Sequence, residues 1–193
     1  MVTLENRILD AAKHLCERWG RDKVTVDDIA EAARCSRATL YRLFPGGKDT
    51  LYEALRARET QDFFVELTAH LHGADTFEEL IVRSVVESTR ALHADEHLQL
   101  MLASAPNEVA TDLTIEGLPR IVAVASEFLR PWYARHVSDA EAHRLAEWLS
   151  RVVISYFLAP SAYVDLADEA SATAFVRDFV LPAFAPQLTL TRR

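Results

Sequence analysis

The chain has 193 residues, half of them hydrophobic, and a net charge of −8. This length suits one mid-sized domain or a small head on a larger body, and only five Gly and seven Pro argue against extensive disorder. No apolar stretch approaches the roughly 18–20 residues of a membrane span, and the N-terminus lacks the apolar region of a signal peptide. We therefore expect a cytoplasmic protein with a substantial core.

The charges are unevenly distributed along the chain. Residues 1–58 carry 11 basic and 9 acidic side chains, whereas residues 59–193 carry 10 basic and 20 acidic ones. Because salt screens charges beyond roughly 8–10 Å, only the charge close to a phosphate matters for nucleic-acid binding. A slightly basic head on an acidic body suits a protein that contacts DNA at one end.

The first two predicted helices are marked by their ends. Apolar residues follow helical spacing up to Gly20, which ends the first helix. Thr25 is a good N-cap for a second helix, and Asp28 stands at its capping-box position. This second helix is expected to run to about Ala33.

A third, short helix follows after the tight turn Arg34-Cys35. Ser36 caps it, it ends near Phe44, and Pro45-Gly46-Gly47 breaks it. Three short helices with this turn predict a helix-turn-helix at about residues 25–44.

The rest of the chain is also expected to be helical. The break at 45–47 predicts two domains, a DNA-binding domain of residues 1–47 and a helical body of residues 48–193. The fold is therefore predicted to be all-α, with about nine helices and a frayed tail at 187–193. The expected body helices are 48 or 49 to 72, 76–93, short pieces in 95–118, 119–136, 138–159 and 171–184.

The third helix has two kinds of face. Leu40 and Phe44 are one turn apart and are expected to face the head's core. Long donors reach base edges, small residues allow close approach, and hydroxyls bond phosphates, so the remaining faces suit the major groove. They carry Arg37, Ala38, Thr39, Tyr41 and Arg42. Taken singly these residues also suit a solvated surface, but their order and spacing favour DNA binding.

These residues resemble a known family. The run Thr25–Ala33, then Ser36, then Thr39–Phe44, then Lys48 and Leu51 looks like the TetR family of bacterial regulators, over about residues 4–55. The resemblance implies a homodimer with an N-terminal DNA-binding head and a C-terminal ligand-binding and dimerisation body. Most members are repressors that a small ligand releases from DNA, so a bacterial, nucleoid-associated location is implied.

The resemblance also implies roles for single residues. Thr25 matches the N-cap that often bonds phosphate, and Arg37–Thr39 match the base-reading turn. Tyr41 matches an aromatic residue that contacts the phosphate backbone, and Lys48 matches the lysine that anchors phosphate at the start of the fourth helix. At Ser36, the N-terminus of the third helix presents a partial positive charge to the DNA phosphate backbone.

Two positions depart from the family pattern. Arg34 stands where the family usually has Gly, so either Arg34 adopts a left-handed conformation at a cost of about 1–2 kcal/mol or the turn is reshaped. Its side chain could then reach a phosphate. The loop at 45–48 is also one residue longer than usual, which affects the register of Lys48.

The body suggests an interface and a pocket. The helix 139–159 and the last helix carry wide apolar stripes, and the resemblance implies that this pair forms the dimer interface, with Trp148, Val152, Phe175 and Phe179 as candidates. A hydrophobic or amphipathic effector could occupy a cavity between the middle helices, although an ordinary packed core explains each residue as well. Its candidate lining is Met101, Leu102, Phe128, Trp132 and Tyr156.

One motif of an enzyme needs an explanation. His93-Ala94-Asp95-Glu96-His97 reads as an inverted zinc-protease motif. Asp95, however, resembles an N-cap, so a helix boundary should separate the two histidines. The two cysteines, Cys16 and Cys35, have no paired spacing and are expected to be small core residues. We expect no enzyme activity, metal or cofactor, and a small-molecule effector, double-stranded DNA and a second copy of the chain as partners.

Overall fold

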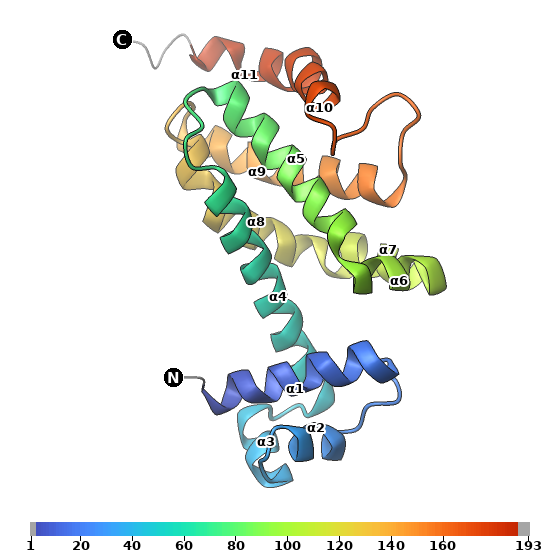
Figure 1. The fold of residues 1–193 in the computed structure, drawn as a ribbon. Helices are drawn as coiled ribbons and strands as arrows, with labels where there is room; N and C mark the ends of the chain where they lie inside the picture. Colours follow the sequence, from blue (N-terminus) through green and yellow to red (C-terminus); the bar gives the residue numbers. More distant parts are fainter. Residues whose placement is uncertain (1–2, 189–193) are drawn as a thin grey trace. The chain divides into compact units, whose positions relative to one another are not determined.

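The structure is a computed structural model that describes residues 3–188, except for the side chains of His97, Glu108 and residues 185–188. Within this range the chain is all helical, as predicted, and forms two compact units that divide between Thr60 and Gln61 (Figure 1). The predicted frayed tail lies, from residue 189 onward, outside the described residues.

The head consists of α1 (Leu4–Trp19), α2 (Val26–Ala32), α3 (Arg37–Leu43) and the first half of α4 (Lys48–His70) (Figure 1). Each boundary lies within two residues of its prediction. Gly20 ends α1 with a φ of 82°, a conformation in which side chains other than glycine are strained.

One small core holds these four helices together. Burial of apolar surface is the main force that stabilises such a cluster, at about 25 cal/mol per Å². Both cysteines are free and pack at the edge of this core, as predicted, and the Cys16 thiol lies 3.1 Å from the Tyr52 hydroxyl. The buried members are Ile8, Leu9, Ala12, Leu15, Val24, Ile29, Ala30, Ala33, Leu40, Phe44, Leu51, Tyr52 and Leu55.

Helix α4 supplies residues to two cores. Leu51, Tyr52 and Leu55 lie in the head's core, whereas Phe64 and Leu67 belong to the core of the second unit. The compact head therefore extends past Gly47 into α4, while the domain boundary at that residue stays a prediction.

After the second half of α4, the body continues with α5 (Phe77–Ala94), α6 (Glu96–Ser104) and α7 (Pro106–Thr111). Asp95 separates α5 from α6, because its carboxylate accepts a hydrogen bond from the N–H of Leu98 at 2.9 Å. The helix boundary predicted inside the zinc-protease-like motif is thus confirmed.

A π-helical turn, η1 (Asp112–Glu116), leads into α8 (Leu118–Tyr133), which packs along α9 (Asp139–Leu158) (Figure 1). Helix α5 packs on both of them. Ser138 caps α9 as predicted, accepting a hydrogen bond from the N–H of Glu141.

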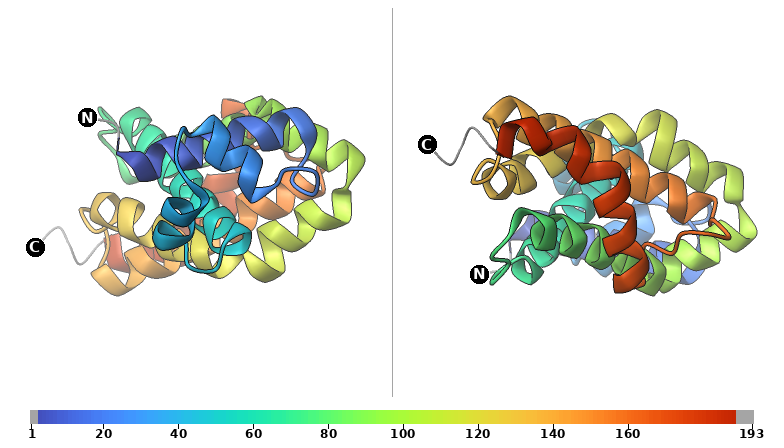
Figure 2. Two further views of the ribbon diagram at one scale, coloured as in Figure 1. Left: turned by 90° about the horizontal axis from the view of Figure 1, so that it is seen from below. Right: turned by 90° about the horizontal axis from the view of Figure 1, so that it is seen from above.

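The last predicted helix, at 171–184, is present but is longer and contains a π-helical turn. It consists of α10 (Glu169–Phe175), the π-helical turn η2 (Val176–Val180) and α11 (Leu181–Leu188), which follow one another without a break. Asp168, rather than a later residue, caps α10 by accepting from the N–H of Ser171 at 2.8 Å. Both α10 and η2 pack on α5, and the view from above in Figure 2 shows this C-terminal segment.

Candidate nucleic-acid interface

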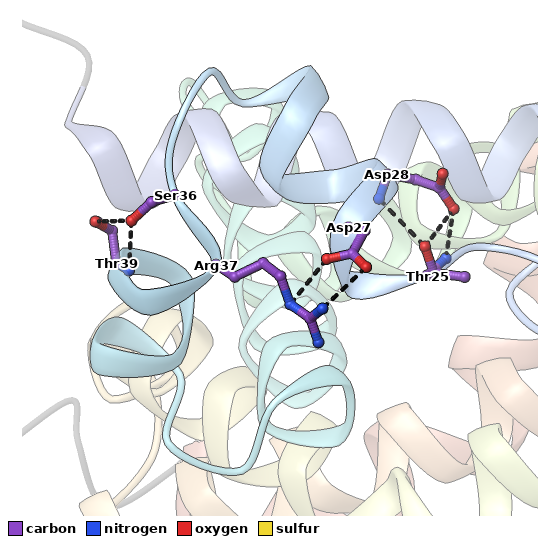
Figure 3. A network of polar contacts seen from close by, with 6 residues as sticks. All are labelled: Thr25, Asp27, Asp28, Ser36, Arg37 and Thr39. Carbon is purple, nitrogen blue, oxygen red and sulfur yellow. Dashed lines mark hydrogen bonds and ion pairs between the residues drawn. The ribbon is translucent and has the colours of Figure 1, made fainter.

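The helix-turn-helix begins with a closed cap at Thr25. Its hydroxyl accepts a hydrogen bond from the N–H of Asp28 at 3.2 Å and donates one to the Asp28 carboxylate at 2.6 Å, which also accepts from the Thr25 N–H at 2.8 Å (Figure 3). The hydrogen bonds from the Thr25 hydroxyl and then from its backbone N–H lower the pKa of Asp28. The predicted capping box is therefore present, and it fixes the direction in which α2 starts.

The turn between α2 and α3 is left-handed at Arg34, which has a φ of 53°. The N–H of Arg34 donates to the carbonyl of Glu31 at 3.0 Å, and the N–H of Cys35 donates to the carbonyl of Ala30 at 2.9 Å. These two bonds form a Schellman motif, which usually has Gly at its left-handed position. Of the two alternatives raised by the sequence, the strained left-handed turn is the one adopted, and the Arg34 side chain is exposed.

The N-terminus of α3 is held by two hydroxyls. Ser36 accepts a hydrogen bond from the N–H of Thr39 at 3.1 Å, and the hydroxyl oxygens of the two residues lie 2.9 Å apart (Figure 3). Ser36 is thus the N-cap, as predicted.

Helix α3 presents one face to the core and the others to solvent. Leu40 and Phe44 are buried, which confirms their predicted role in holding the helix. The remaining candidates lie on the exposed surface of α3, although Thr39 is half-buried; these are Arg37, Ala38, Thr39, Tyr41 and Arg42.

Arg37 is already engaged by another side chain of the head. Its Nε lies 2.8 Å from Oδ1 of Asp27, and its Nη1 donates to Oδ2 of the same carboxylate at 3.1 Å (Figure 3). Asp27 is in the first turn of α2, so the ion pair joins the starts of the two helices of the motif.

The loop after α3 brings Gly47 next to Tyr41. Gly47 has a φ of 66°, and a Cβ placed on it would lie 3.0 Å from Cε1 of Tyr41. Lys48 is the first residue of α4 despite the longer loop, and its Nζ lies 5.6 Å from the centre of the Tyr52 ring. A lysine ammonium at this distance from an aromatic ring is weakly attracted to it.

Sequence reasoning missed two residues of this surface. Asp27 is the second residue of α2, where an acidic residue is expected for the helix dipole alone, so no local signal pointed to Arg37 ten residues later. Gly47 was assigned only to a helix break, whereas its contact with Tyr41 depends on how the loop folds back.

The predicted effector residues occupy three parts of the body. Phe128 and Trp132 lie one turn apart on α8, where Phe128 stacks on Phe64 and Trp132 contacts His72 edge to face. Tyr156 contacts Phe175 instead, with ring centres 5.7 Å apart. Met101 and Leu102 are half-buried on α6.

The predicted dimer residues differ in exposure. Trp148 and Phe179 are 37% and 63% exposed, Val152 is half-buried, and Phe175 is buried within the chain behind Phe179. Trp148 and Phe179 also border an open hollow of about 400 Å³ between α9 and the C-terminal segment. The rest of its lining is Arg144, Glu147, Arg151, Ala183 and Phe184.

The described residues offer neither a metal site nor a membrane span. No group of three His, Cys, Asp or Glu there could hold a metal ion, and the side chain of His97 in the zinc-protease-like motif lies outside them. No helix among the residues that the structure describes is long and apolar enough to cross a bilayer.

Comparison with known proteins agrees with this geometry. Residues 8–55 match the model of the bacterial regulatory proteins of the tetR family. The chain is 28% identical over 189 residues to an uncharacterized HTH-type transcriptional regulator of Mycobacterium tuberculosis, covering 97% of this chain and 89% of that protein. It is 29% identical over 175 residues to the HTH-type transcriptional regulator BetI of Brucella suis, covering 90% and 87% of the two chains.

A solved structure extends the similarity over the whole fold. The TetR family repressor AlkX from Dietzia sp. strain DQ12-45-1b superimposes with a TM-score of 0.71 at 22% identity, covering 96% of this chain and 97% of that one. The relatives of this chain are transcription regulators rather than enzymes. The chain is thus similar to bacterial transcription regulators of the tetR family, in residues 8–55 by the family model and over most of its length by these relatives.

Proposed function

We propose that the chain is a ligand-responsive repressor that binds a palindromic operator as a homodimer in the bacterial cytoplasm, on the nucleoid. The observation that carries the proposal is the exposed surface of α3, a capped helix anchored by the buried Leu40 and Phe44. A short helix fixed in this way can enter the major groove without rearranging its own core.

The head offers two kinds of contact. Arg37, Ala38 and Thr39 form the first turn of α3, where side chains meet base edges in a helix-turn-helix. Thr25, Ser36, Tyr41, Arg42 and Lys48 surround that turn and are our candidates for phosphate contacts. Such contacts set the register of the protein on the duplex, whereas the base contacts select the sequence.

A second copy is proposed to cover the surface formed by Trp148, Val152 and Phe179, with Phe175 supporting Phe179 from within. Large apolar side chains exposed together favour a protein partner. The two-fold axis of such a dimer would place two α3 helices in successive major grooves, about 34–36 Å apart, which requires a palindromic operator.

The effector is proposed to be hydrophobic or amphipathic. The rings of Phe128 and Trp132 are half-buried against the body core and offer apolar contacts, to which Met101, Leu102 and Tyr156 would add. Its binding would be coupled to DNA binding, typically by about 1–3 kcal/mol.

The test is selection of bound sites from random DNA with the full chain, followed by gel retardation. An inverted repeat with half-sites one helical turn apart is the expected result. Failure to enrich any sequence, with no retardation of the DNA upstream of the chain's own gene, would refute the proposal. Arg37→Ala should then reduce affinity for the selected site by about 1–3 kcal/mol if Arg37 reads a guanine.

A further inference from the structure

The ion pair between Asp27 and Arg37 uses only part of the guanidinium. A guanidinium carries five N–H donors, one on Nε and two on each Nη. Asp27 accepts one N–H of Nη1 at 3.1 Å, and its other carboxylate oxygen lies 2.8 Å from Nε as an ion pair. The end of the group, with one N–H on Nη1 and one on Nη2, remains available to a second acceptor.

The N–H groups on that remaining edge can donate hydrogen bonds to a guanine. Two parallel N–H groups of arginine match the N7 and O6 acceptors that guanine presents in the major groove. The ion pair therefore leaves Arg37 able to bind a base and restricts the directions in which its end can point. Arginine can hold a carboxylate on one side of its planar guanidinium and a base on the other, whereas lysine is a single point charge.

Asp27 lies in the first turn of α2, where a carboxylate favours the helix dipole, and among the described side chains it pairs with Arg37. Asp28, not Asp27, makes the side-chain contacts of the α2 capping box. A carboxylate on a DNA-binding surface repels the phosphates and weakens binding unless a cation neutralises it. Asp27 pairs with the first residue of α3 across the turn, and Figure 3 shows the carboxylate facing the guanidinium.

We propose that Asp27 is a specificity-determining residue, which holds Arg37 so that the end of its guanidinium reads a guanine in each half-site. The inference rests on the proposed function, since it requires that α3 enters the major groove. The two side chains are 62% and 59% exposed, so in the free protein the pair contributes little. On DNA, exclusion of water strengthens the ion pair, and Asp27 then acts on specificity rather than on folding.

The experiment measures Kd values of the full chain for three duplexes: the selected operator, the same operator with the guanine nearest Arg37 replaced by adenine, and a random sequence. Asp27→Asn is expected to lower the preference for guanine over adenine by about 3- to 10-fold while binding random DNA equally or more tightly. Arg37→Lys should lose the same preference even with Asp27 present.

Two controls separate the effect from general electrostatics. Asp22→Asn removes the same charge from an exposed site in the same head and should leave the preference unchanged. In an Arg37→Ala background, Asp27→Asn should change the preference by less than about twofold, because the residue through which it acts is gone.

The outcomes are distinct. Equal preferences for Asp27→Asn and Asp22→Asn would overturn the inference, since the ion pair would then be a solvated surface contact only. Tighter operator binding with the preference intact would also overturn it, because Asp27 would then compete with DNA for Arg37. If the unmodified chain selects no DNA, the proposed function fails first, and this inference fails with it.

Discussion

Replacing Arg34 with glycine should stabilise the head. Arg34 has a φ of 53°, and an L side chain in this region costs about 1–2 kcal/mol. Glycine removes that cost but gives the unfolded chain more freedom, worth about 0.4–1 kcal/mol in the other direction. The expected net gain is about 0.5–1 kcal/mol, and the exposed Arg34 side chain makes no hydrogen bond or ion pair with the described residues that the substitution would remove.

The gain is best measured by native-state hydrogen exchange in the full chain, because the two compact units need not unfold together. The amide of Leu40, which donates to the Ser36 carbonyl at 3.0 Å, reports on α3. Its exchange should slow by about two- to fivefold in Arg34→Gly, the ratio that corresponds to the expected gain.

Arg34→Ala is the matched control, since it removes the charge and the long side chain but keeps the Cβ that causes the strain. It should give no protection. If alanine protects Leu40 as well as glycine does, the strain argument is wrong, and the benefit comes from removing the arginine side chain itself. Salt-dependent DNA binding of the same two variants tests whether Arg34 reaches phosphate, because both would then weaken binding alike.

Three further predictions concern the same head. Gly47→Ala should lower head stability by about 1–2 kcal/mol in thermal unfolding, because it forces a left-handed alanine against Tyr41; unchanged stability would contradict the contact. The pKa of Asp28 is lowered in the folded state, so its contribution to stability is complete above the ordinary pKa of 3.8 and is lost as the pH falls through the lowered pKa. Asp28→Asn should therefore flatten the acid side of the profile of unfolding free energy against pH. An unchanged profile would argue against the Thr25 contacts. Lys48→Ala should weaken binding to all DNA sequences alike and reduce the slope of log Kd against log salt by about one, whereas a sequence-selective loss would exclude a phosphate role.

The local signals in the sequence were sufficient for the helix-turn-helix. The cap at Thr25, the cap at Ser36 and the stop at Gly20 all involve residues at most four positions apart, and all are present in the structure. Leu40 and Phe44 were also assigned correctly to the core, because one turn of helix places them on the same face.

The C-terminal segment has a feature that local sequence signals did not predict. Helical spacing predicted one helix, but a π-helical turn at 176–180 inserts an extra residue into the turn and shifts the faces that follow. Phe175 is buried, whereas Phe179 is exposed, although the two residues are four positions apart. The turn packs against α5, a segment about a hundred residues earlier, so its surroundings are not contained in any local window of sequence.

The sequence by itself therefore determined the all-α class, the position of α3 and the residues on the exposed faces of α3, because helix caps and helical spacing are local. Only the tertiary structure decided how that helix is presented. The left-handed conformation of Arg34 and the pairing of Arg37 with Asp27 depend on how α2 and α3 pack around the shared head core. Contacts of this kind join residues that are distant in the chain or involve backbone angles that residue type alone does not set.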